Sequence, residues 1–162
     1  MDELKLYCDR VAGAVGRIST DIFGLPRQVG ETLAMSEGLA LQLTNILRDL
    51  VEDSLLDRLY LPADVLAAHG VTETSDLSEV LSHPRLPQVC EVLAGVAALN
   101  FKEAIKTANH CDVNCVRPAM MMLQVYRRIL KRLQHRGWKD LATPVSLSKP
   151  VKLWIAFRYG VL

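Results

Sequence analysis

Apolar side chains recur at steps of three and four residues through most of the chain. The first such run extends from Leu4 to Ile22 and predicts a helix that ends near Gly24 and Pro26. Alternation of apolar and polar residues at a period of two, which is typical of strands, is nearly absent. The pattern therefore predicts an all-α protein.

Proline and glycine residues divide the rest of the chain into further helices. The same periodicity predicts them at about 30–57, from Pro62 to Ala68, at 86–109 and at 116–135, and a short helical turn is the most that we expect at 76–81. Gly70 and Gly137 act as stop signals, and 72–82 is polar and typical of a connecting segment. Half of the 162 residues are apolar, so we expect residues 1–162 to form one domain.

The middle of the first predicted helix is rich in small residues. They are Ala12, Gly13, Ala14 and Gly16. Because glycine weakens a helix relative to alanine, this choice of residues needs a reason. It predicts that either another helix or the tail of a ligand approaches this backbone closely.

Oxygen-bearing side chains recur along one face of the second predicted helix. At about 100° per residue they fall within an arc of about 80°, and Asp57 extends the row. The row consists of Gln42, Asn45, Asp49 and Asp53. An apolar stripe on the adjoining flank places this row at the edge of a packed surface. The stripe consists of Leu39, Leu43, Ile46 and Leu50.

The two aspartates of this row, Asp49 and Asp53, repel each other by roughly 0.2–0.5 kcal/mol at their four-residue spacing. Magnesium would remove that repulsion, because it binds one or two carboxylates and leaves its other positions to water and phosphate oxygens. Arg48 and Arg58 flank the row, and guanidinium groups match phosphate oxygens in shape and charge. A charged, solvated helix face is the alternative interpretation of the same pattern.

The charge balance of the chain argues against a nucleic-acid partner. Nineteen basic residues stand against eighteen acidic ones, so no overall field attracts a polyanion. No run of about 18 apolar residues is present, and the first residues lack the features of a signal peptide. We expect a cytoplasmic protein.

Four cysteines invite a disulfide or zinc interpretation. They are Cys8, Cys90, Cys111 and Cys115, the last two close to His110 and Asp112. A single C-x-x-x-C pair is a poor zinc signature, and the expected compartment keeps thiols reduced. We therefore expect free thiols, buried or solvated.

The C-terminal part of the chain is basic. A run on and after the last long helix is typical of a solvated face, and it consists of Arg127, Arg128, Lys131, Arg132, His135, Arg136 and Lys139. The tail, 149–162, mixes basic with apolar and aromatic residues, among them Lys149, Lys152, Leu153, Trp154, Phe157 and Arg158. Such a tail fits either peripheral contact with an anionic membrane surface or a final helix docked on the core.

Two stretches resemble motifs of one known family. LALQLTNILRDLVEDSLLDRLYLPADVL, from Leu39 to Leu66, resembles the second aspartate-rich segment of the squalene and phytoene synthases, which are trans-prenyl condensing enzymes. YCDRVAGAVG, from Tyr7 to Gly16, resembles the upstream tyrosine helix of the same family. Within the family, the bacterial presqualene diphosphate and squalene synthases of hopanoid pathways look closest.

The resemblance implies a helical bundle of the isoprenoid-synthase type, of which this chain is the C-terminal part. Members of the family carry a first aspartate-rich helix upstream of the tyrosine helix, and only Met1 to Leu6 precede Tyr7 here. We therefore expect an incomplete bundle. Either a partner chain supplies the N-terminal half, or the chain is a truncated, non-catalytic member.

The resemblance also implies a reaction and a role for each site residue. The intact protein would join two farnesyl diphosphates head to head, giving presqualene diphosphate or, with NADPH as reductant, squalene. A phytoene-type condensation of geranylgeranyl diphosphate is the alternative. The metal ligands would be Asn45, Asp49 and Asp53. The residues that contact the diphosphate would be Gln42, Arg48, Arg58 and Tyr60, and the catalytic residues would be Tyr7 and Arg48.

Two positions depart from the family pattern. Val51 and Asp57 stand where many members have glycine, and both residues are compatible with the helix predicted there. Neither departure removes a proposed metal ligand.

Overall fold

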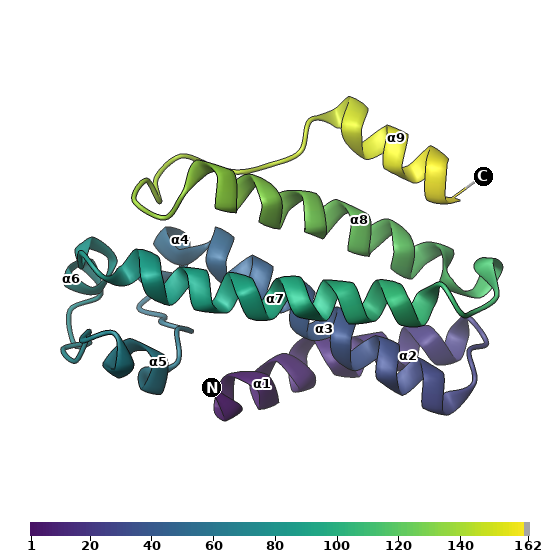
Figure 1. Ribbon diagram of the computed structural model, residues 1–162, viewed down its shortest axis with the longest axis horizontal. Helices are drawn as coiled ribbons and strands as arrows, with labels where there is room; N and C mark the ends of the chain where they lie inside the picture. The colour runs from purple at the N-terminus through teal and green to yellow at the C-terminus, as the bar shows by residue number, and fades with distance from the viewer. Residues whose placement is uncertain (161–162) are drawn as a thin grey trace.

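The computed structural model describes residues 1–160, and within them every regular element is helical, which confirms the all-α prediction (Figure 1). The N-terminal half contains α1 (Asp2–Cys8), the π-helical segment η1 (Asp9–Gly13), α2 (Ala14–Ile22), α3 (Arg27–Arg48) and α4 (Leu50–Leu55). The C-terminal half contains α5 (Ala63–Ala68), α6 (Leu77–Ser82), α7 (Leu86–Ala108), α8 (Val113–Arg136) and α9 (Lys149–Gly160).

Helix α3 lies at the centre of the structure. It packs against α7 and α8 on one side and against α1, η1 and α2 on the other. Helix α7 runs along the length of the molecule, with α5 and α6 near one of its ends and α9 lying along α8 (Figure 1). The faces of α3 that meet these helices are buried, whereas Gln28, Glu31 and Met35 are exposed.

Leucine and phenylalanine side chains fill the space between these helices. Leu33, Leu43 and Leu47 of α3 are fully buried, and Phe101 of α7 and Leu123 of α8 close over them from the other side of the core. Burial of each such side chain contributes roughly 1.5–3 kcal/mol. Because these contacts come from helices far apart in the sequence, they hold α3 in place against its neighbours.

Two contacts between small residues bring the N-terminal helices close to α3. A β-carbon built on Gly38 would lie 2.8 Å from the Gly13 nitrogen, and one built on Gly16 would lie 3.0 Å from the Ala34 β-carbon. Only glycine fits at such separations. The prediction of a close approach is confirmed, and the approaching element is a helix.

The helix predicted over 30–57 is wrong in one respect, because it breaks at Asp49. The backbone there has φ −103° and ψ 16°, away from helical values, and separates α3 from α4. Helical hydrogen bonding resumes with the bond from the Asp53 N–H to the Asp49 carbonyl, at 2.8 Å. The row of oxygen-bearing side chains therefore crosses a bend instead of following one straight helix.

The extension of that row to Asp57 is also wrong. Helix α4 ends at Leu55, and Asp57 adopts a left-handed backbone with φ 55°. This conformation is costly for a residue with a β-carbon, although aspartate tolerates it better than most. The strain explains why glycine suits this position, and it means that Asp57 is not compatible with the predicted helix.

The tail forms a docked helix. Ile155 of α9 is buried, and the Arg117 guanidinium of α8 donates a hydrogen bond of 3.0 Å to the Gly160 carbonyl. Leu153, Trp154 and Phe157 remain largely exposed on the opposite side, so membrane contact stays a prediction. The last two residues of the predicted tail segment, 161–162, lie outside the described residues. Within 1–160, no helix combines the length and apolar character needed to span a bilayer.

Candidate functional site

The bend at the α3–α4 junction holds a paired arginine and aspartate. Arg48 Nε donates to Asp49 Oδ1 and Arg48 Nη2 donates to Asp49 Oδ2, each at 2.7 Å. Asp49 raises the pKa of Arg48, with a smaller contribution from Tyr126 of α8. Such a two-point, charge-assisted contact is strong and fixes the orientation of the carboxylate.

Asp53, one turn further on, is the less well compensated carboxylate. Its pKa is raised first by burial and then by the negative charge of Asp49, while Arg58 acts in the opposite direction. Asp49 and Asp53 are thus close enough to repel each other, and only the first is held by a bidentate partner. A cation bound between them would relieve both the burial cost and the repulsion.

Asn45 completes this group from the last turns of α3. Its Oδ1 atom is buried and has no hydrogen-bond partner among residues 1–160. Buried carbonyl oxygens are nearly always satisfied, so an orphan of this kind points to a missing partner such as an ion or water. The amide oxygen and the two carboxylates are a donor set that suits magnesium.

Clusters of other metal-binding chemistry are absent from the described part of the chain. No three His, Cys, Asp or Glu side chains of residues 1–160 converge on one point. All four thiols are free, and burial raises the pKa of Cys8 and of Cys90 to about 12. The prediction of free thiols is confirmed.

Tyr7 and Tyr60 stack beside the acidic pair. Their ring centroids are 5.1 Å apart and the ring planes differ by 22°. The pKa of Tyr7 is raised to about 12, chiefly by burial, then by Tyr60, with smaller contributions from Cys8 and Asp53. The Tyr7 hydroxyl therefore stays protonated at neutral pH and remains a hydrogen-bond donor.

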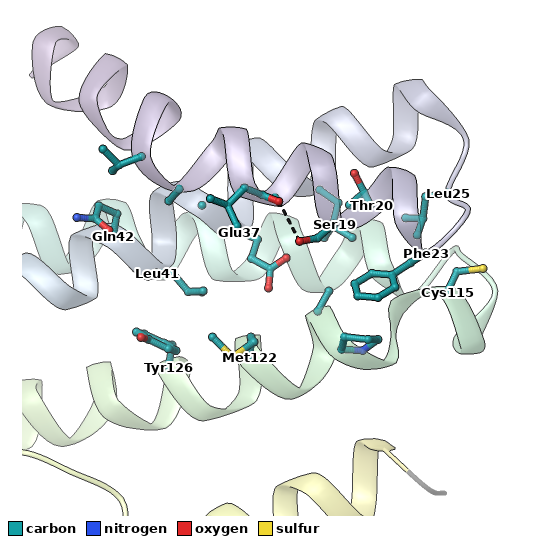
Figure 2. Close-up of a pocket in the computed structure, with 18 of the residues that line it drawn as sticks. Ser19, Thr20, Phe23, Leu25, Glu37, Leu41, Gln42, Cys115, Met122 and Tyr126 are labelled. Carbon is teal, nitrogen blue, oxygen red and sulfur yellow. Dashed lines mark hydrogen bonds between the residues drawn. The ribbon is translucent and has the colours of Figure 1, made fainter.

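A cavity of about 380 Å³ opens next to this polar group, between η1, α2, α3 and α8 (Figure 2). Gln42 and Asn45 both line it. Figure 2 shows Gln42 at the opposite end of the cavity from Phe23 and Cys115. Its other lining residues are mostly apolar and include Val11, Ala12, Val15, Phe23, Leu25, Leu33, Leu41, Pro118, Ala119 and Met122.

The predicted site residues thus fall into two places. The junction brings together Tyr7, Asn45, Arg48, Asp49, Asp53, Arg58 and Tyr60. Gln42 lies one turn away, in the cavity. Tyr7 and Ala14 do not line this cavity; Tyr7 faces a separate hollow that it shares with Tyr60 and Pro62.

Sequence reasoning missed Glu37, an acidic residue that lines the cavity. Burial raises the pKa of its carboxyl group to about 8. The signal was present, because Glu37 lies four residues from both Leu33 and Leu41 and therefore on the apolar side of α3. A charged residue on an apolar stripe is a stronger marker of function than one on a solvated face.

Several known proteins are similar to this chain. A model of the squalene/phytoene synthase family matches residues 1–152. The chain is 43% identical to a presqualene diphosphate synthase of Sinorhizobium fredii, over all of this chain and 58% of that protein. It is 41% identical to a phytoene synthase of Thermus thermophilus, over 90% of this chain and 49% of that protein.

A solved structure is also similar. The crystal structure of a dehydrosqualene synthase in complex with ligand matches with a TM-score of 0.74 and 27% sequence identity, over 98% of this chain and 56% of that one. The chain spans about half the length of the relatives it matches. With the family model covering nearly the whole sequence, the chain belongs to the squalene/phytoene synthase family.

Proposed function

We propose that this chain forms the diphosphate-binding part of a synthase that condenses two farnesyl diphosphates head to head to presqualene diphosphate. The observation that carries the proposal is the position of Asn45, whose unpartnered oxygen belongs to the acidic junction while its side chain also lines the apolar cavity. A prenyl diphosphate has the same division into an anionic head and a hydrocarbon tail. The relatives named presqualene diphosphate synthase support the choice of product.

In this proposal the head of the substrate lies at the α3–α4 junction. Asn45, Asp49 and Asp53 would hold magnesium, which neutralises the leaving diphosphate so that the allylic carbon–oxygen bond can ionise. Arg48 and Arg58 would contact diphosphate oxygens directly. The orphaned amide oxygen and the incompletely compensated Asp53 carboxylate support this assignment.

Tyr7 and Tyr60 would act beside the head group. The raised pKa of Tyr7 keeps its hydroxyl neutral, so it can donate a hydrogen bond near the reacting carbons without adding charge. In a preparation with turnover, Tyr7→Phe should lower the turnover number and leave substrate affinity unchanged. An unchanged turnover number would remove Tyr7 from the mechanism.

Condensation of geranylgeranyl diphosphate is the second candidate, and the similarity to phytoene synthases favours it. A non-catalytic role is the third, because the chain spans only about half the length of its relatives. In a catalytic assembly, a partner chain would supply the remaining half. We further propose a cytoplasmic location, with the exposed aromatic residues of α9 resting on the inner face of the membrane.

Product analysis tests these candidates. The folded chain is incubated with magnesium and either farnesyl or geranylgeranyl diphosphate, with and without NADPH, and the products are identified by mass spectrometry. Presqualene diphosphate, or squalene when NADPH is present, would support the proposed reaction. Turnover of the longer substrate alone would favour the phytoene type, and absence of product from a helical, folded chain would favour the non-catalytic role.

A further inference from the structure

A single carboxyl group, that of Glu37, lies partway along the apolar cavity. Figure 2 shows it pointing into the space between α2 and α8, with Leu41 and Tyr126 on the side of the polar end and Phe23 on the far side. Along α3 it is eight residues from Asn45, which corresponds to about 12 Å. Glu37 therefore stands at a defined depth in the cavity.

The Glu37 carboxyl group has no protein partner. Within residues 1–160 it takes part in no hydrogen bond or ion pair, and its pKa is raised by burial alone. The nearby hydroxyls of Ser19 and Thr20 donate within their own helix, to the carbonyls of Val15 and Arg17 at 2.9 and 3.0 Å. Water that enters the cavity is the remaining partner for this carboxyl group.

We propose that Glu37 limits the length of the hydrocarbon tail that the cavity accepts. The inference rests on the proposed function, because it assumes that the tail enters from the end formed by Gln42 and Asn45. A tail that ends before Glu37 contacts apolar side chains such as Leu41 and Met122 and leaves the carboxyl group hydrated. A longer tail displaces that water and offers no hydrogen bond in return.

The loss of affinity expected for a tail that displaces this water is large enough to decide between substrates. Leaving a buried polar group without a partner lowers affinity by about ten- to a hundredfold. One further isoprene unit in an apolar slot would otherwise raise affinity, because it buries more hydrocarbon. Glu37 therefore makes the cavity prefer the tail that stops short of it.

Binding of three prenyl diphosphates in the presence of magnesium tests the proposal. Isothermal titration calorimetry would give affinities for geranyl, farnesyl and geranylgeranyl diphosphate with the parent chain and with Glu37→Leu. We expect Glu37→Leu to bind the longest tail at least about tenfold more tightly than the parent, with the affinity for the shortest tail unchanged. Glu37→Gln should keep the parent's preference, because an amide has the same unmet hydrogen bonds.

Matched controls separate this effect from a general change in hydrophobicity. Glu103 is exposed on α7, away from the cavity, so Glu103→Leu should leave all three affinities unchanged. Glu37→Met replaces the leucine variant if that variant does not fold. An unchanged preference in the folded apolar variant, or an equal gain for all three tails, overturns the inference and leaves the proposed function standing. Failure of the parent to bind any of the three overturns both.

Discussion

The ionisation of Glu37 should make the stability of this protein depend on pH. Its carboxyl group has an ordinary pKa of 4.5 and, because it is buried in the cavity, a folded-state pKa of about 8. Between these values the folded state holds a proton that the unfolded state releases. Stability is therefore lost as pH rises from about 4.5 to about 8 and stays constant above that range.

The size of the effect follows from the two pKa values. A rise in the pKa of Glu37 from 4.5 in the unfolded state to about 8 in the folded state changes the free energy of unfolding by at most about 5 kcal/mol. Because the side chain is partly open to water in the cavity, we expect about 2–3 kcal/mol. Cys115 and Tyr126 of α8 line the same cavity and are present in both of the chains that are compared.

Urea unfolding of the parent chain and of Glu37→Gln, followed by far-ultraviolet circular dichroism, measures this difference. The variant cannot ionise, so its advantage in free energy of unfolding over the parent should grow by about 2–3 kcal/mol between about pH 5 and about pH 8.5. Glu103→Gln, at an exposed position, should show no such growth. The same advantage at both pH values would refute the argument that Glu37 is buried without a partner.

Three further pairs of substitutions test other parts of the structure. Asp49→Asn should abolish the magnesium-dependent rise in Tm that farnesyl diphosphate produces. The control Asp21→Asn, on the exposed end of α2, should retain that rise. Equal rises in Tm for the two variants would remove Asp49 from the proposed metal site. Gly38→Ala should lower the free energy of unfolding by about 1–3 kcal/mol, because the new methyl group meets the backbone of η1. Gly95→Ala, where the added β-carbon meets nothing within 4 Å, should raise the free energy of unfolding by about 0.5–1 kcal/mol. Similar changes for the two glycine variants would show that the close contact at Gly38 has no energetic cost. Asp57→Gly should raise the free energy of unfolding by about 0.5 kcal/mol, because glycine adopts the left-handed backbone without strain, whereas Asp57→Ala should not raise it. A loss of stability in the glycine variant would contradict the strain argument.

Local signals in the sequence were enough to predict most helix boundaries. Helix α5 follows Pro62 and closes at Gly70, which has φ 76°, and α6 begins after Asp76, whose carboxylate accepts a hydrogen bond from the Ser78 N–H. Helix α8 begins three residues earlier than predicted because Asp112 caps it in the same way. These boundaries depend on interactions within a few residues, which a periodic pattern and a capping residue already contain.

Features that depend on tertiary packing could not be predicted from local signals. The π-helical segment η1, Asp9–Gly13, lies where this backbone meets Gly38 of α3. The periodicity of the sequence from α1 to α2 had indicated one regular helix. The candidate site shows the same division. The row from Gln42 to Asp53 was visible in the sequence, whereas the stacking of Tyr7 on Tyr60 requires two segments to meet in space.

The bend at Asp49 also explains why its two neighbouring carboxylates differ. On a regular helix, adjacent side chains diverge by about 100°, and residues at i and i+1 do not face each other. Asp49 departs from helical values, and Arg48 reaches both of its carboxylate oxygens. For Asp53, inside α4, Arg58 is the one group among residues 1–160 that offsets the charge of Asp49. The sequence motif suggests two equivalent aspartates, but in the structure Asp49 is half of an ion pair, whereas burial and the charge of Asp49 raise the pKa of Asp53.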